Sequence, residues 1–196
     1  VEPGLVEQGM ERASIIKNHL SPDLGRVILE PKATGWLQGR SYTLLPYCKP
    51  LGTGRIITRL HNFTLRPLVI DWLTQVTEAT VREPDAVEIQ KNFIQPLEHL
   101  AQMPVVAPEI RSIAKSALQQ LQSSQWKPRH VVMHGDLWRG NILFSDPKTR
   151  PKNLPFARLV IIDWPGAMID GYAIYDLIRI GMSMRLPKIF LQRHIK

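Results

Sequence analysis

The segment "VVMHGDLWRGNILF", residues 131–144, constrains the fold more than any other part of the sequence. Two short apolar runs, 131–133 and 142–144, flank an octapeptide that holds a histidine, an aspartate, an arginine and an asparagine. Apolar runs of this length are typical of short buried strands. The pattern therefore predicts two strands joined by a polar loop, and loops held by rigid flanking elements often carry functional groups.

A third apolar run, "ARLVIID" at 157–163, ends on Asp163. If residues 141–144 pair with this run as a hairpin, Asn141 and Asp163 come to the same end of it. An amide oxygen and a carboxylate suit a hard cation such as Mg²⁺, which takes oxygen ligands and keeps several waters. Asp136 stands apart from this pair and is free to accept a proton from a substrate hydroxyl.

This division of roles matches the arrangement used by kinases. Their catalytic loop carries an aspartate and, five residues later, an asparagine, and a second metal-binding aspartate follows beyond a hairpin. Phosphoryl transfer needs in-line positioning and cations that offset charge on the phosphate oxygens, and it needs little covalent help. The spacing of Asp136, Asn141 and Asp163 thus favours phosphoryl transfer.

The motif "HGDLWRGNIL", with "LVIIDW" and "YDL" after it, resembles the aminoglycoside phosphotransferase and choline kinase-like family of small-molecule kinases. The resemblance covers residues at about 131–178. The tryptophan directly after "HGDL", Trp138, is similar to what the fructosamine kinase branch of the family has at this position. It implies an α+β, protein-kinase-like, two-lobe fold. Residues 1–47 would form a partial N-lobe that ends in a hinge, and residues 48–196 a mainly helical C-lobe with a small catalytic hairpin.

The resemblance also implies roles for individual residues. Asp136 would be the catalytic base or would orient the substrate, and Asn141 and Asp163 would bind magnesium. In the predicted hinge "LLPYC", backbone groups at Tyr47 and Cys48 would hydrogen-bond adenine.

Four further residues have supporting roles under the same resemblance. His134 would brace the catalytic loop as a hydrogen-bonded core histidine. Asp176, in "YDL", would hold that loop by accepting backbone hydrogen bonds, a role compatible with its place near a helix start. Glu11 is either the partner of a phosphate-binding lysine or a solvated helix residue, and Arg139 contacts either phosphate or solvent.

The sequence also departs from the family pattern. Neither a lysine-bearing strand nor a glycine-rich loop precedes the first predicted helix, and "GTG" at 52–54 comes after the predicted hinge. Trp138 stands where protein kinases carry a loop lysine, and Pro165 follows "IDW", where the family often has an acidic residue. If residues 1–196 are the whole molecule, we expect ATP binding to be impaired, and if they are a fragment, the missing N-lobe strands lie upstream of Val1. The sequence also ends soon after "YDL", before the helices that usually complete an acceptor pocket in this family.

The spacing of apolar residues and the positions of glycine, proline and helix-capping residues predict the remaining elements. They are a helix at 5–20, strands at 26–30 and 41–47 separated by a glycine-containing turn, a linker at 48–54, a helix with Thr64 as N-cap, helices at 85–101 and 108–123, a loop at 145–156, and a helix from Ala173.

Composition excludes several classes of protein. Cys48 is the one cysteine, so the chain can form no internal disulfide and no cysteine-based zinc site, and we expect a reducing, cytoplasmic location. No apolar stretch approaches ~20 residues, which argues against a membrane span. The formal charge of +8 is dispersed and lacks a nucleic-acid motif, so we interpret it as a solvated basic surface.

The sequence thus predicts an ATP- and Mg²⁺-dependent kinase that phosphorylates a hydroxyl of an amino sugar, a ketosamine, a sugar or an amino alcohol. The charge of +8 argues mildly against a polycationic acceptor. The alternative is a non-catalytic kinase-like module that binds a nucleotide or a protein partner, and the missing lysine-bearing strand motivates it. The oligomeric state cannot be predicted from the sequence.

Overall fold

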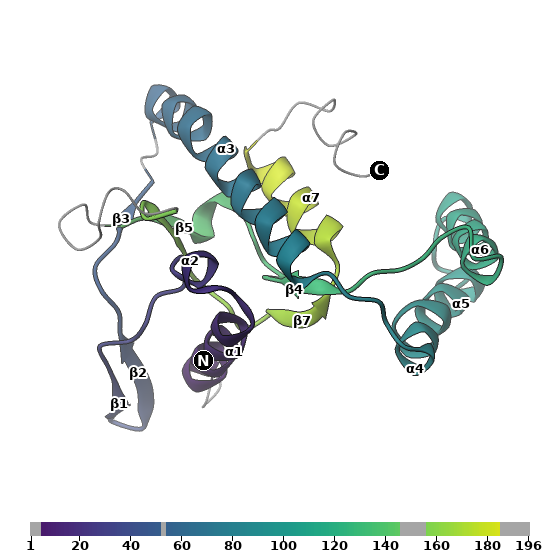
Figure 1. Cartoon of the computed structure of the whole chain (residues 1–196), viewed down its shortest axis with the longest axis horizontal. Helices are drawn as coiled ribbons and strands as arrows, with labels where there is room; N and C mark the ends of the chain where they lie inside the picture. The colour runs from purple at the N-terminus through teal and green to yellow at the C-terminus, as the bar shows by residue number, and fades with distance from the viewer. Residues whose placement is uncertain (1–4, 52–53, 146–155, 185–196) are drawn as a thin grey trace. The chain divides into compact units, whose positions relative to one another are not determined.

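The computed structural model describes residues 5–51, 54–145 and 156–184 and has a mixed α+β architecture with small sheets (Figure 1). The predicted α+β class is confirmed, whereas the kinase-like two-lobe arrangement stays a prediction. The chain divides into two compact units: residues 1–80 with 131–196, here called the main unit, and residues 81–130, here called the insert. Most of the predicted loop at 145–156 lies outside the described residues.

The first helices of the main unit follow their sequence signals. Helix α1 (Leu5–His19) confirms the helix predicted at 5–20. It buries one face, because its apolar residues recur at helical spacing: Ala13, Ile16 and, just past its end, Leu20. A single short turn, α2 (Pro22–Gly25), comes next and has proline at its first position.

The prediction of a strand at 26–30 is wrong. These residues are buried for the most part, but only Ile28 forms a bridge, in parallel with Ile161, where Ile161 N–H also donates to the Val27 carbonyl at 2.9 Å. An apolar run signals burial and does not by itself specify a hydrogen-bonded partner strand.

The strand expected at 41–47 is shorter and has a different partner. Strand β2 (Arg40–Leu44) pairs antiparallel with β1 (Ala33–Leu37), which the sequence analysis did not predict. Gln38 and Gly39 connect them with φ of 51° and 74°. Positive φ at both central residues is what a two-residue type I′ hairpin turn requires.

The predicted pairing of residues 141–144 with the run at 157–163 is confirmed. Strands β5 (Ile142–Phe144) and β6 (Leu159–Ile161) pair antiparallel with Ile142 opposite Ile161. The short strand β3 (Lys49–Pro50) adds to β5 from the other side, so part of the predicted linker at 48–54 is instead a strand.

Helix α3 (Arg55–Thr80) begins nine residues before the predicted N-cap. Thr64 lies inside the helix, where its hydroxyl donates to the carbonyls of Leu60 at 3.1 Å and His61 at 3.2 Å. Such back-bonding satisfies the hydroxyl within a helix and removes the need for a cap there. Neither α3 nor any other described helix is long and apolar enough to cross a membrane.

Strand β4 (Val131–Met133) pairs antiparallel with β7 (Met168–Gly171). The chain then enters α7 (Ala173–Met184), which confirms the helix predicted from Ala173. Helix α7 lies beside α3 in the main unit (Figure 1).

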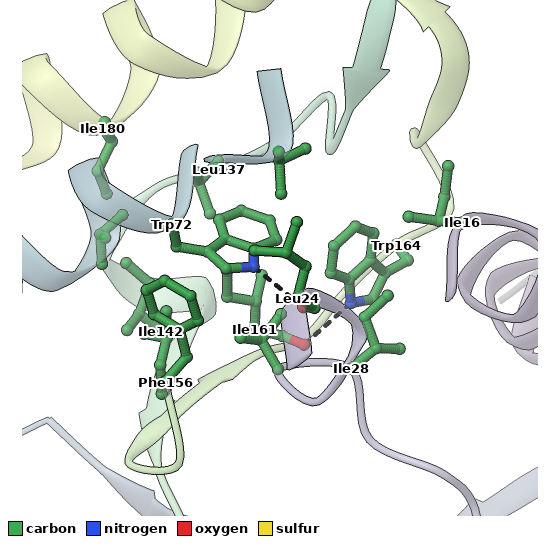
Figure 2. Packing of buried hydrophobic residues seen from close by; sticks show 14 of the residues in the cluster. Ile16, Leu24, Ile28, Trp72, Leu137, Ile142, Phe156, Ile161, Trp164 and Ile180 are labelled. Atoms are coloured by element: carbon green, nitrogen blue, oxygen red, sulfur yellow. Dashed lines mark hydrogen bonds between the residues drawn. The ribbon is translucent and has the colours of Figure 1, made fainter. Parts of the chain in front are cut away.

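Two tryptophans organise the core of the main unit (Figure 2). Trp72 of α3 and Trp164, which follows β6, meet edge to face with ring centroids 6.5 Å apart. Both indole N–H groups are satisfied: Trp72 donates to the Leu24 carbonyl at 3.1 Å and Trp164 to the Ile161 carbonyl at 2.9 Å. The core therefore fixes the end of β6, where Asp163 follows.

The insert is helical, as predicted. Helix α4 (Ala86–Ile89), a π-helical turn (Gln90–Ile94) and α5 (Gln95–Gln102) form one continuous segment, and α6 (Pro108–Gln122) follows. Pro96 explains the π-helical turn, because a proline inside a helix clashes with the carbonyl four residues before it.

Candidate functional site

The polar loop between β4 and β5 is anchored by residues that point inward. Leu137 is fully buried in the core, and His134 and Asn141 are also buried. Trp138 and the carboxylate of Asp136 face outward, since both side chains are more than a third exposed. The alternation of buried and exposed residues holds the loop in place while presenting Asp136 at the surface.

Gly135 allows the loop to lie against the segment after β6. Its φ is +82°, a left-handed conformation that favours glycine. A Cβ at this position would lie 2.3 Å from the Gly166 carbonyl oxygen, a backbone atom that cannot rotate away. The loop and the "IDWPG" segment can approach this closely only because residue 135 is glycine.

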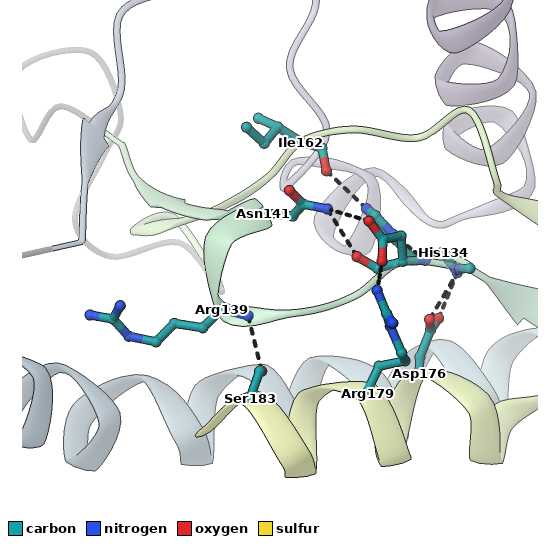
Figure 3. A network of polar contacts seen from close by, with 9 residues as sticks. His134, Arg139, Asn141, Ile162, Asp176, Arg179 and Ser183 are labelled. Atoms are coloured by element: carbon teal, nitrogen blue, oxygen red, sulfur yellow. Dashed lines mark hydrogen bonds and ion pairs between the residues drawn. The ribbon is translucent and has the colours of Figure 1, made fainter. Parts of the chain in front are cut away.

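Asp176 holds the start of this loop from the first turn of α7. Its two carboxylate oxygens accept hydrogen bonds from His134 N–H at 2.6 Å and Gly135 N–H at 3.0 Å, so the predicted contacts are confirmed (Figure 3). Burial raises the pKa of Asp176 to about 6, although these N–H donors and that of Leu137 act in the opposite direction. At neutral pH the group is therefore predominantly ionised.

His134 braces the loop in its neutral form. Its Nε2 lies 3.0 Å from the Ile162 carbonyl, and its Nδ1 accepts from Asp136 N–H at 3.2 Å. A carbonyl can only accept and an amide N–H can only donate, so Nε2 carries the proton and Nδ1 is bare. Burial lowers the pKa of His134 to about 4, which agrees with this tautomer. The ring also packs on Trp164, with centroids 4.4 Å apart.

Asn141 is tied to Asp136 through its amide nitrogen. Nδ2 lies 2.9 Å from the Asp136 backbone carbonyl and 3.3 Å from Asp136 Oδ2. With its nitrogen turned toward Asp136, the amide carbonyl oxygen of Asn141 points the other way (Figure 3). That oxygen is the atom by which Asn141 would bind a cation.

The hairpin brings Asn141 and Asp163 to the same end. Ile162 N–H donates to the Asn141 carbonyl at 3.0 Å, which extends the pairing of β5 with β6 by one residue, and Asp163 follows immediately. Asp163 is exposed and has φ of 69°, a left-handed conformation uncommon outside glycine. Such outliers are concentrated at functional sites, which makes Asp163 a candidate on backbone grounds as well.

The two oxygen ligands that Asn141 and Asp163 would offer suit magnesium better than a metal ion whose ligands all come from the protein. Within the described residues, no group of three or more histidine, cysteine, aspartate or glutamate side chains is arranged to hold a metal ion. Asn141 and Asp163 would supply two oxygen ligands. Mg²⁺ commonly takes one or two protein ligands and completes its shell with water and substrate phosphate oxygens.

Arg179 is a site residue that the sequence analysis missed. Its Nη2 forms an ion pair with Asp136 Oδ1. The arginine that we predicted, Arg139, contributes its backbone N–H to Ser183 Oγ at 3.0 Å, and its side chain points away from Arg179 (Figure 3). The spacing of Arg179 three residues after Asp176 was the available signal, because residues three apart share a helix face.

One face of α7 therefore follows the loop residue by residue. Asp176 contacts His134 and Gly135, Arg179 contacts Asp136, and Ser183 contacts Arg139. The three residues of α7 lie at helical spacing. Each contact is hydrogen-bonded or ionic, so residues 134–139 of the loop are aligned along the helix.

The predicted nucleotide-binding and phosphate-support residues lie apart from this network. Tyr47 is 79% exposed, and the Cys48 thiol donates to the Pro46 carbonyl at 3.6 Å, just before β3. Glu11 is exposed on α1, the helix whose Gly9 lies against Pro165. Within the described part of the chain, none of Tyr47, Cys48 and Glu11 forms a hydrogen bond or ion pair with Asp136.

A pocket of about 600 Å³ lies elsewhere in the main unit. Lys17, Arg26 and Lys32 contribute charge to it, Ile28 and Leu29 form apolar wall, and Pro46 and Ala157 complete the lining together with other nearby residues. None of Asp136, Asn141 and Asp163 lines it. The pocket is therefore separate from the loop and the hairpin that carry these three residues.

Comparisons of the sequence with protein-family models and with curated proteins found no match. The resemblance of the segment at about 131–178 to small-molecule kinases rests on its motifs alone.

Proposed function

We propose that this protein is an ATP- and Mg²⁺-dependent kinase that phosphorylates a hydroxyl group of a small molecule. The observation that carries the proposal is the arrangement of Asp136, Asn141 and Asp163 around one hairpin. Asp136 is held beside Asn141 by two contacts, and the backbone pairing of Asn141 with Ile162 brings Asp163 to the same end.

The residues have separate tasks in this proposal. Asn141 and Asp163 would hold Mg²⁺, which when bound offsets the charge on the transferring phosphate oxygens. Asp136 orients the acceptor hydroxyl and takes its proton. As that hydroxyl oxygen bonds to the γ-phosphorus of ATP, the bond from phosphorus to the bridging oxygen breaks and ADP departs, so the atoms and charges balance.

Positioning supports this assignment more than chemical reactivity does. Asp176 and His134 fix the loop through backbone hydrogen bonds, and Asp136 needs only to be held at the right distance from the hydroxyl. Correct placement of reacting groups supplies much of the rate enhancement in such reactions. The proposed adenine-binding residues Tyr47 and Cys48 directly precede β3, which pairs with β5 of the same hairpin.

A non-catalytic, nucleotide-binding module is the second candidate. The ion pair with Arg179 favours it, because that contact occupies one oxygen of the proposed base. Both candidates predict nucleotide binding, and only the kinase predicts turnover.

Thermal unfolding with a non-hydrolysable ATP analogue tests the metal site of the proposal. A ligand at about 100 times its dissociation constant stabilises the native state by about 2.7 kcal/mol. Mg²⁺ with the analogue should therefore raise the melting temperature of the wild-type chain, and Asp163→Ala should lose the Mg²⁺-dependent part of that rise.

Asp71→Ala is the matched control, because it removes an exposed carboxylate from α3. It should keep the full Mg²⁺-dependent rise. A rise that survives in Asp163→Ala would place the cation elsewhere, and no rise in the wild type would contradict nucleotide binding itself.

A further inference from the structure

Arg179 is a charged group in contact with the proposed base, and it has no role in the proposed chemistry so far. It sits on the loop-facing side of α7, three residues after Asp176, and its Nη2 contacts Asp136 Oδ1. The other oxygen of Asp136 is the one beside Asn141 Nδ2. The two oxygens of the proposed base thus have different neighbours, one cationic and one neutral.

The exposure of this ion pair indicates that it is exchangeable. The side chains of Arg179 and Asp136 are 43% and 38% exposed. Ion pairs between such exposed groups contribute little to stability, because water solvates both partners almost as well. The pair is therefore a poor candidate for a structural device, whereas a nearby ligand could readily replace one of its partners.

Most of the hydrogen-bonding capacity of Arg179 is unused within the described part of the chain. A guanidinium has five N–H donors in a planar fork, and here Asp136 is the one described partner. Such a fork matches the two oxygens of a carboxylate or phosphate, so arginine commonly recognises these groups. Arg179 consequently presents free donors beside the position at which an acceptor hydroxyl would meet Asp136.

The sign of the charge also selects among acceptors. A cationic acceptor would meet the guanidinium next to its reacting hydroxyl, and like charges at such a distance repel. An anionic acceptor would otherwise be repelled by the carboxylate of Asp136, and Arg179 offsets that repulsion. The formal charge of +8 on the whole chain attracts anions in the same sense.

We propose that Arg179 is a specificity-determining residue that binds an oxyanion of the acceptor, so that the acceptor is a hydroxy acid or a phosphorylated hydroxy compound. The oxyanion engages the free donors of Arg179 and draws the guanidinium from Asp136 Oδ1, and that oxygen then receives the acceptor hydroxyl. This inference rests on the proposed kinase function and narrows its acceptor class away from amino sugars and amino alcohols.

Matched acceptors that differ in charge test the inference. ATP consumption is measured with gluconate and gluconamide, glycerate and glyceramide, and ribose 5-phosphate and ribose, and glucosamine serves as a cationic acceptor. The first two pairs test carboxylates and the third tests phosphates. The wild-type chain should favour the anionic member of at least one pair by about 10-fold or more in kcat/KM, on the order expected for a charged hydrogen bond.

Substitutions then assign the preference to Arg179. Arg179→Gln should remove it through a loss of about 10- to 100-fold in kcat/KM for the anionic member, with the KM for ATP unchanged. Arg179→Lys should retain part of it, because it keeps the charge but loses the fork. Lys115→Gln, which removes an exposed positive charge from α6 in the insert, should leave the preference intact.

Several results would overturn the inference. An equal loss of kcat on charged and neutral acceptors in Arg179→Gln would make Arg179 a positioning residue for Asp136, and a raised KM for ATP would place it on the nucleotide. Turnover without a preference for anionic acceptors would refute the inference alone. Mg·ATP binding without consumption of any acceptor would refute the inference and would favour the non-catalytic module over the kinase. Failure to bind Mg·ATP would refute the proposed function and the inference with it.

Discussion

Asp176 accepts hydrogen bonds from two consecutive backbone N–H groups, those of His134 at 2.6 Å and Gly135 at 3.0 Å. A single carboxylate on α7 thereby sets the conformation of the loop that presents Asp136. The relationship joins parts of the chain that are 41 and 42 residues apart in sequence.

Asp176→Ala should weaken both folding and function. The substitution leaves two backbone N–H groups without their charged acceptor, and hydrogen bonds to charged groups contribute about 1.5–3 kcal/mol each. We expect the free energy of unfolding in urea to fall by about 3 kcal/mol or more. Asp71→Ala, on an exposed face of α3, should change it by less than about 0.5 kcal/mol. Similar small losses in the two variants would show that Asp176 does not hold the loop.

Gly135→Ala should be far more damaging than alanine at another glycine of positive φ. Gly39 has φ of +74°, and a Cβ added there would meet no other atom within 4 Å, so Gly39→Ala costs only the conformational strain, about 1 kcal/mol. At Gly135 the same strain adds to a contact of 2.3 Å with the Gly166 carbonyl oxygen. Urea unfolding of both variants measures the difference, and equal destabilisation would contradict the close approach of the two backbones.

His134 should make stability depend on pH. Burial lowers its pKa from 6.5 to about 4, so the unfolded chain takes up the proton first as the pH falls. The contribution of neutral His134 is complete above pH 6.5 and is lost toward pH 4, a change of about 3 kcal/mol. Asp176 acts in the opposite direction, because its pKa is raised from 3.8 to about 6 and the native state is protonated first.

The His134→Gln variant separates these two effects. Urea unfolding of the wild type and the variant at about pH 7, 6, 5 and 4 gives their difference in free energy of unfolding across the range in which His134 titrates. As the pH falls, the free energy of unfolding of the wild type should decrease relative to that of His134→Gln, because only the wild type must keep a buried histidine neutral. Parallel pH profiles would show that His134 is not held in its neutral form.

The parts of the fold that could be predicted from the sequence are those in which burial and pairing coincide. Strands β5 and β6 are short apolar runs that face the core and pair with each other. Their apolar pattern therefore indicated both their burial and their pairing. Residues 26–30 are similarly apolar but pair at a single residue, because burial alone does not choose a partner. Strand β1 is mostly exposed and lacks an apolar alternation, and its signal was the Gln38–Gly39 turn.

The candidate site divides in the same way. The positions of Asp136, Asn141 and Asp163 on one loop and one hairpin could be predicted from local spacing, whereas the contact of Asp176 with the loop was predicted from the resemblance of "YDL" to the kinase-like family. The spacing of Arg179 from Asp176 put both residues on one face of α7, but the choice of Asp136 as the partner of Arg179 depends on how α7 docks along the loop, which the sequence does not specify. The prediction that Thr64 is an N-cap was wrong for a related reason. The Thr64 hydroxyl finds carbonyl acceptors one turn earlier within α3, so the helix continues on both sides of Thr64.

The turnover number of Asp136→Asn tests the proposed kinase function more directly than any other measurement. This change keeps the shape of the side chain and removes its charge and most of its basicity, and general-base groups typically contribute ~10²–10⁴-fold in rate. With an acceptor that the wild-type chain phosphorylates, kcat for ATP consumption should fall by about that factor, while a parallel titration shows Mg·ATP affinity nearly unchanged. Equal turnover by wild type and Asp136→Asn on the same acceptor would contradict the role of Asp136 as the base and, with it, the proposed mechanism of phosphoryl transfer.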